Sequence, residues 1–208
     1  MAARPVRAAG RARDAGGRLV LWSVAEGARG RRWREATLDG VAPALARSLT
    51  IETGPDRLPS RLEAATGLGL LTLHPEPHGV YGNAVGRRGV RPIAIERAMP
   101  GTRLLVDGSG LSAAALAWSM EPVVPVGDRV SVDVIRVELP EPGGDGDILV
   151  GLETVSAQRI DAGVWRLIRA GREPMEVHVD PDGLPMAGPG RRWPLDAEEP
   201  GSASPDRP

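Results

Sequence analysis

The stretch Val130-Ser131-Val132-Asp133-Val134-Ile135-Arg136-Val137-Glu138 decides the fold class of this chain. Apolar and polar residues alternate along it, so that Val130, Val132 and Val134 share one face of a strand. The alternation shifts by one residue near Ile135, which predicts either a β-bulge or a strongly coiled strand. A strand with one buried and one solvated face is typical of antiparallel sheets.

The same kind of segment recurs on both sides of this stretch, and turn signals separate the segments about every ten residues, as in β-meanders, sandwiches and barrels. Strands are predicted over residues 18–24, 48–53, 68–74, 91–96, 103–107, 129–139, 148–156, 164–169 and 175–180. Two stretches could be helical: residues 40–47, interrupted by Pro43, and Ser112–Met120, with Ser112 as its N-cap. The prediction is an all-β antiparallel meander that forms a closed or half-closed barrel, lipocalin-like, with one short helix.

The 208 residues fit one β-domain with polar extensions. We expect a flexible Arg- and Ala-rich arm at 1–17, a single β-barrel domain at 18–195 and a disordered acidic tail at 196–208. The core must be largely aliphatic, because the chain has no Phe, one Tyr and five Trp.

Composition excludes several functional classes. A net charge of −1 argues against general nucleic-acid binding, which needs a basic face. The chain has no cysteine, so it has neither disulfides nor thiolate metal sites. No secretory signal and no apolar run long enough for a membrane span is found, so a cytoplasmic location is expected. All basic residues are Arg, which fits the bias of a GC-rich bacterial genome.

One motif is similar to a sequence pattern of nucleotide-binding proteins. Gly108-Ser109-Gly110-Leu111-Ser112-Ala113 follows a predicted strand and precedes the predicted helix, as the dinucleotide-binding fingerprint does. The helix ends within about two turns at Pro122 and no further βα units surround it. A tight turn before a short helix is therefore the favoured interpretation.

For the other candidate sites, an ordinary turn or loop is the favoured interpretation. His74, Glu76 and His78 form a potential metal cluster, but they lie where a hairpin turn is predicted. The Gly-Asp-rich loop 143–147 lacks the ligand spacing of an EF-hand. Ser109 lacks the outer glycines of a nucleophile elbow. We therefore predict no catalytic residues, no metal and no cofactor.

If the basic stretch around Trp33 is a strand, its arginines lie on different faces. Arg32 and Arg34 share one face, opposite Arg31 and Trp33. An exposed arginine face beside a core tryptophan is the favoured reading; an anion or lipid head-group site and a nucleic-acid surface are the alternatives.

Residues 125–193 resemble the bacterial putative glycolipid-binding family. The resemblance rests on segment order: Pro125-Val126-Gly127 before the Val-rich strand, a strand with Arg159, the strand around Trp165, and then Val177–Leu184 before Arg191-Arg192. Ala187-Gly188-Pro189-Gly190 replaces the family's Tyr-Pro-Gly run. The resemblance implies a many-stranded barrel similar in shape to lipoprotein carriers, an amphipathic ligand within it, and no cofactor.

Three functional hypotheses remain open. The first is non-catalytic binding of an apolar or amphipathic small ligand, such as a glycolipid, inside the barrel. Its candidate ligand-binding residues are Trp22, Arg32, Arg34, Trp118, Trp165 and Arg166. The second is an enzyme of specialised metabolism on the same scaffold, with its acid or base drawn from Glu63, His74, Asp133 and His178. The third is a cavity-free interaction or structural module. The sequence leaves the oligomeric state open.

Overall fold

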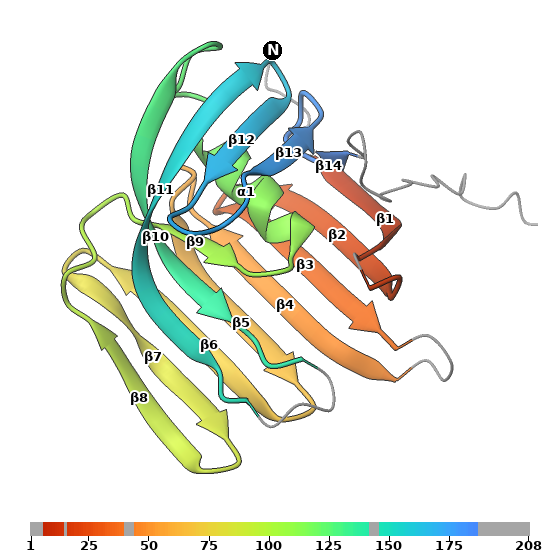
Figure 1. The fold of residues 1–208 in the computed structure, drawn as a ribbon, viewed down its shortest axis with the longest axis vertical. Coiled ribbons are helices and arrows are strands. Elements are labelled where there is room, and N and C mark those ends of the chain that lie inside the picture. Colours follow the sequence, from red (N-terminus) through yellow and green to blue (C-terminus); the bar gives the residue numbers. More distant parts are fainter. Residues whose placement is uncertain (1–5, 15, 40–43, 142–145, 187–208) are drawn as a thin grey trace, which may run out of the picture.

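The computed structural model describes residues 6–14, 16–39, 44–141 and 146–186. Within these ranges the chain forms fourteen strands and one helix, which confirms the predicted all-β class (Figure 1). The strands of the first half are β1 (Arg7–Arg13), β2 (Leu19–Gly27), β3 (Gly30–Leu38), β4 (Leu45–Thr53), β5 (Pro59–Thr66), β6 (Gly69–Glu76), β7 (Gly79–Gly86) and β8 (Gly89–Ile95). The second half contains β9 (Arg103–Val106), α1 (Gly110–Met120), β10 (Arg129–Glu138), β11 (Leu149–Asp161), β12 (Val164–Ile168), β13 (Met175–Val179) and β14 (Pro185–Met186).

The first eight strands form one antiparallel sheet in sequence order, here called the large sheet. Each strand pairs with the next through a short connection, as the regular spacing of turn signals predicts. In β3, Arg31, Trp33, Glu35 and Thr37 are buried, whereas Arg32 and Arg34 are exposed. The predicted facing of the basic stretch is thus confirmed.

The remaining six strands form the small sheet, in the order β14-β13-β12-β11-β10-β9. All its pairs are antiparallel except β9 with β10, which are parallel because α1 connects them as a crossover. The meander is therefore interrupted once, at the strand–turn–helix motif of residues 103–120. Arg91, on the edge strand β8, donates a hydrogen bond from Nη2 to Ile148 O at 2.6 Å. Ile148 directly precedes β11, so this hydrogen bond links the two sheets.

The shifted alternation in β10 reflects coiling and not a bulge. Its pairing with β11 continues from Arg129 to Glu138 without a register shift. Val134 packs in the core of the small sheet, while Ile135 and Val137 pack in the core of the large sheet. Consecutive residues on both faces must therefore be apolar, since β10 passes from one core to the other.

Helix α1 lies between the two sheets, as Figure 1 shows, and residues 111–120 are all buried. Leu111, Ala115 and Trp118 pack on the large sheet, whereas Leu116 and Met120 pack on the small one. A helix that is apolar on all sides is typical of such a position. The predicted barrel-like fold with one short helix is thus confirmed in its half-closed form, and the helix lies in its interior.

Two predicted segments differ from the structure, and five of its strands lie outside the predicted ranges: β1, β3, β5, β7 and β14. The arm predicted to be flexible contains β1, whose Ala8, Gly10 and Ala12 face the core beside Trp22. Gly10 is required there, because a Cβ atom would lie 2.7 Å from the Trp22 ring. The helical turn predicted at 40–47 is wrong in its last part, since residues 45–47 begin β4. The predicted tail lies outside the described residues.

No helix in the described ranges combines the length and the apolar character needed to cross a bilayer.

Candidate functional site: the cleft at the start of α1

The turn that begins α1 is fixed by two serines. Ser109 is the N-cap, and its Oγ accepts a hydrogen bond of 3.0 Å from Ser112 N. Ser112, predicted as the cap, lies one turn later, where its Oγ accepts from Val106 N at 2.9 Å. The Gly-x-Gly motif is therefore a tight turn before a short helix, as favoured from the sequence.

A buried carboxylate lies beside the start of α1. Ser109 donates its hydroxyl to Glu35 Oε2 at 2.7 Å, and Glu35 is only 3% exposed. Arg47 Nη2 donates to Glu35 Oε1 at 2.8 Å and to Gly108 O at 3.1 Å. Helix N-termini favour such negative charge. Glu35, Arg47 and Ser109 therefore tie the large sheet to the start of α1.

A second ionic network holds the same turn to the small sheet. Asp107 accepts from Arg136 Nη2 at 2.6 Å and from Arg169 Nη1 at 2.7 Å. Arg169 also donates two 2.9 Å hydrogen bonds to Glu153. Burial raises the pKa of Asp107, but the hydrogen bonds and charges of the two arginines outweigh it, so the net pKa is lowered. The Arg169 hydrogen bond is the main cause of the lowered pKa of Glu153.

These lowered pKa values predict an acid-sensitive fold. Asp107 and Glu153 bind protons more weakly when folded, so their stabilisation is present above their unfolded pKa values, near 4, and is lost as the pH falls through the folded values. We expect Asp107→Asn to lower the free energy of unfolding by about 1–3 kcal/mol at pH 7 and to flatten its decline below about pH 5. Urea unfolding across a pH series measures both effects.

The matched control for this prediction is Asp128→Asn, because Asp128 is exposed. That variant should keep the pH dependence of the parent protein. An Asp107→Asn protein with the parent's stability and slope would contradict the assigned role of the network.

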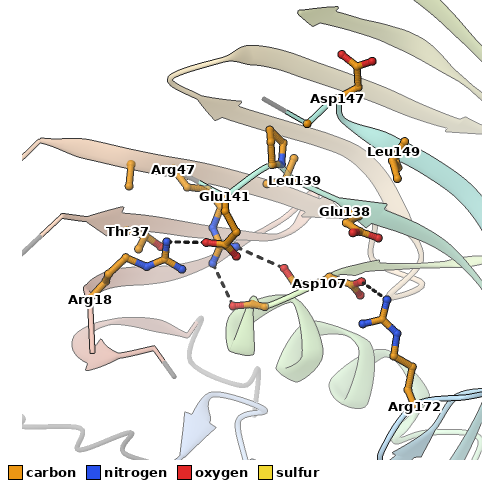
Figure 2. A pocket seen from close by; sticks show the side chains of 14 residues that line it. Arg18, Thr37, Arg47, Asp107, Glu138, Leu139, Glu141, Asp147, Leu149 and Arg172 are labelled. Carbon is orange, nitrogen blue, oxygen red and sulfur yellow. Dashed lines mark hydrogen bonds and ion pairs between the residues drawn. The ribbon is translucent and has the colours of Figure 1, made fainter. Parts of the chain in front are cut away.

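A cleft of about 450 Å³ opens beside the turn, between the two sheets (Figure 2). Its walls combine side chains of both charges with apolar ones. The lining residues are Arg18, Thr37, Ala46, Arg47, Asp107, Gly108, Glu138, Leu139, Pro140, Glu141, Gly146, Asp147, Leu149 and Arg172. We call this the central cleft. Its volume lies within the range of small-molecule sites.

A second cleft of about 410 Å³ continues from the central one, with which it shares Glu138, Leu149 and Arg172. Leu149 and Leu152 are both exposed there, on β11. We call this the side cleft. Together the two clefts present paired charges at the turn and two exposed leucines on β11, Leu149 beside Glu138 and Leu152 on the other face of the strand.

The charges of the central cleft nearly balance. It has three guanidinium groups and four carboxylates, and several are already paired: Arg18 with Glu141 at 3.0 Å, and Arg172 with Asp107 at 3.9 Å (Figure 2). Such a surface does not favour a multiply charged ion. It offers closely spaced hydrogen-bond donors and acceptors, which suit an uncharged polar group.

Two polar atoms at the cleft have no partner among the described residues. Thr37 lines the cleft and is 1% exposed, and its Oγ1 makes no hydrogen bond. The same holds for Nε of Arg47. Buried polar groups are nearly always paired, so these two atoms are an unusual feature of the cleft wall.

The opposite end of α1 is held by aromatic and cationic contacts. Trp118 meets Trp33 edge to face, with ring centroids 5.6 Å apart. Arg31 and Arg57 stack on the Trp118 ring, 4.2 and 4.6 Å from its centroid. Gly183, at φ +76°, packs against the same ring. This end of the helix is therefore closed by side chains.

The structure does not bring the six predicted ligand-binding residues together. Trp22 is buried in the large sheet, and Trp118 and Trp165 pack in different cores on either side of α1. Arg32, Arg34 and Arg166 are exposed, and Arg32 pairs with Glu52. None of the six lines the central or the side cleft.

The four candidate acid–base residues are likewise engaged elsewhere. Glu63 pairs with Arg61, Asp133 accepts from Thr154 at 2.7 Å, and His178 lies 2.6 Å from Glu176. His74 is exposed on β6. Among the described residues no hydrogen bond joins any two of the four, and no group of three or more His, Asp or Glu side chains is placed to hold a metal ion.

Sequence reasoning missed Glu35, Arg47 and Asp107, which shape the central cleft. One signal for Glu35 was present: it shares the inward face of β3 with Trp33, two residues away. A carboxylate at an inward position of an alternating strand is expensive unless it is paired, and so points to a site. Arg47 and Asp107 carried no such signal.

No family model matches the chain, and no curated protein matches it. Among solved structures, the chain is similar to a crystal structure of a DUF1089 family protein from Pseudomonas aeruginosa. The superposition has a TM-score of 0.51 and covers 92% of each chain, with 14% sequence identity. At this identity the similarity shows a shared fold.

Proposed function

We propose that the protein is a non-catalytic carrier of an amphipathic ligand with an uncharged, hydroxyl-rich head group, such as a glycolipid. The head group lies in the central cleft and the apolar part follows the side cleft. The observation that carries the proposal is the 450 Å³ cleft, in which paired charges adjoin apolar side chains. The similarity of residues 125–193 to glycolipid-binding proteins agrees with this ligand class.

The head group is assigned from the hydrogen-bonding capacity of the central cleft. Sugar hydroxyls both donate and accept, so they can bridge Glu138 or Asp147 to a neighbouring guanidinium without adding charge. An anionic head group would instead need an excess of arginines.

The apolar part is assigned from the exposed side chains that continue out of the central cleft. Leu139 and Pro140 line the central cleft, Leu149 lines both clefts, and Leu152 lines the side cleft. Burying such side chains against an alkyl chain contributes about 25 cal/mol for each Å² removed from water. The ligand therefore lies beside α1, and not within a hollow barrel as expected from the sequence.

Binding of octyl glucoside below its critical micelle concentration tests the proposal by isothermal titration calorimetry. We expect saturable binding, with Leu149→Asp weakening it about tenfold or more, since a charge would replace an apolar side chain that lines both clefts. Octyl sulfate should bind more weakly than the glucoside.

The matched control is Leu70→Asp. Leu70 is 54% exposed on β6 and Leu149 is 56% exposed on β11, so both changes place a carboxylate on an accessible strand position. Only Leu149 lines the clefts. Equal affinities of the two variants, or the absence of glucoside binding by the parent protein, would refute the proposal.

A further inference from the structure

The hairpin β7–β8 ends the large sheet in an exposed basic tip. Arg87 and Arg88 form its turn, between Gly86 and Gly89, and both are exposed. Figure 1 shows this hairpin at the outer edge of the large sheet, with its turn at the lower end of the molecule in this view. The tip therefore projects where a flat partner can reach it.

An apolar row adjoins the tip on the outer face of the sheet. Leu70 pairs with Val85, and Val85 pairs with Val90, so the three side chains lie next to one another across β6, β7 and β8. They are 54%, 37% and 67% exposed. A contiguous row of exposed aliphatic side chains on a sheet face is a feature of interaction surfaces.

The charge beside this row is positive. Arg88 makes a 3.6 Å ion pair with Asp147, whose carboxylate is half exposed. Arg91 donates a hydrogen bond to Ile148 O. A second exposed aliphatic pair, Val123 and Val126, lies instead between Glu121 and Asp128. Only the first of these two apolar surfaces thus combines aliphatic side chains with adjacent arginines.

The tip also adjoins the proposed ligand site. Val85, Arg88, Val90 and Asp147 line a small cleft of about 160 Å³, and Asp147 lines the central cleft as well. A surface bound at the tip would therefore lie beside the entrance of the central cleft.

We propose that the β7–β8 tip, defined as Leu70, Val85, Arg87, Arg88 and Val90, docks on the surface of an anionic lipid bilayer. The arginines contact acidic head groups, while the aliphatic row enters the interfacial layer. Charge complementarity selects a bilayer over an uncharged protein partner. The inference goes beyond the carrier function and does not require it, because docking involves no residue assigned to hold the head group.

Vesicle co-sedimentation of the full chain tests this docking. Vesicles of phosphatidylcholine with about 30% phosphatidylglycerol should bind the protein, and about 0.5 M NaCl should weaken binding strongly. Each basic side chain near an anionic surface contributes a factor of about five in partitioning. Arg87→Glu/Arg88→Glu should therefore reduce partitioning by about 25-fold or more, and Leu70→Asp should reduce it several-fold.

Controls separate docking from folding and from ligand binding. Arg32→Glu/Arg34→Glu changes two exposed arginines of β3 and should reduce vesicle partitioning much less than the tip variants do. The same is expected of Val123→Ser/Val126→Ser. Leu149→Asp should keep vesicle binding while losing glucoside binding, and Leu70→Asp should do the reverse. Equal partitioning of the tip and control variants, or equal binding to pure phosphatidylcholine, would overturn the proposal. Failure of glucoside binding alone would leave docking intact.

Discussion

Replacing Glu35 by alanine is expected to lower the free energy of unfolding by about 3–5 kcal/mol, because it removes one partner of a buried ion pair. The Arg47 side chain, itself largely buried, would lose its carboxylate, and Ser109 would lose the acceptor of its hydroxyl. The polar contacts between the start of α1 and the large sheet would then be reduced to the carbonyl contacts of Arg47. Urea denaturation at neutral pH measures the loss.

The control for Glu35 is Glu63→Ala. Glu63 also pairs with an arginine, Arg61, but both side chains are about half exposed. Exposed pairs contribute at most about 1 kcal/mol. A double variant, Glu35→Ala with Arg47→Ala, should be less destabilised than the sum of the single changes, since the two groups share one interaction. Additive losses, or equal effects at Glu35 and Glu63, would show that the pair does not anchor the helix.

The second large effect is expected for Trp118→Ala, with a loss of about 3–5 kcal/mol. The change removes the ring that meets Trp33 and on which Arg31 and Arg57 stack. It would also leave a void against Gly183, where the ring is packed closely. Thermal or urea unfolding followed by far-ultraviolet circular dichroism measures the effect.

Val123→Ala, three residues after the end of α1, is the matched control for Trp118. Val123 is largely exposed, so its truncation should change stability by less than about 0.5 kcal/mol. A Trp118→Ala protein as stable as this control would mean that the closed end of α1 does not depend on the aromatic contact.

Glu35 and Trp118 together explain why the helix stays between the sheets. One fixes its first turn through charge, and the other fixes its last turns through aromatic packing. The proposed ligand site is next to the first anchor, at the side where the sheets separate and the central cleft opens. Variants of Glu35 should therefore disturb ligand binding as well as stability, whereas Leu149→Asp should affect binding alone.

The local elements could be predicted from the sequence because their signals are local. Alternation in Val130–Glu138 identified β10, and the Ala-rich stretch before Pro122 identified α1. The facing of Arg31 and Arg32 followed from a period of two. β1 was missed because its inward residues are Ala and Gly, which have low strand propensity and give little hydrophobic contrast.

By itself, then, the sequence determined the β class, most strand positions, the single helix and the buried face of β3. The tertiary structure alone decided that α1 lies between two sheets, that β9 pairs parallel to β10, and that Glu35, Arg47 and Asp107 meet at one turn. These features depend on contacts between segments far apart in the chain. Residue spacing sets which face a side chain takes, but long-range packing sets what that face meets.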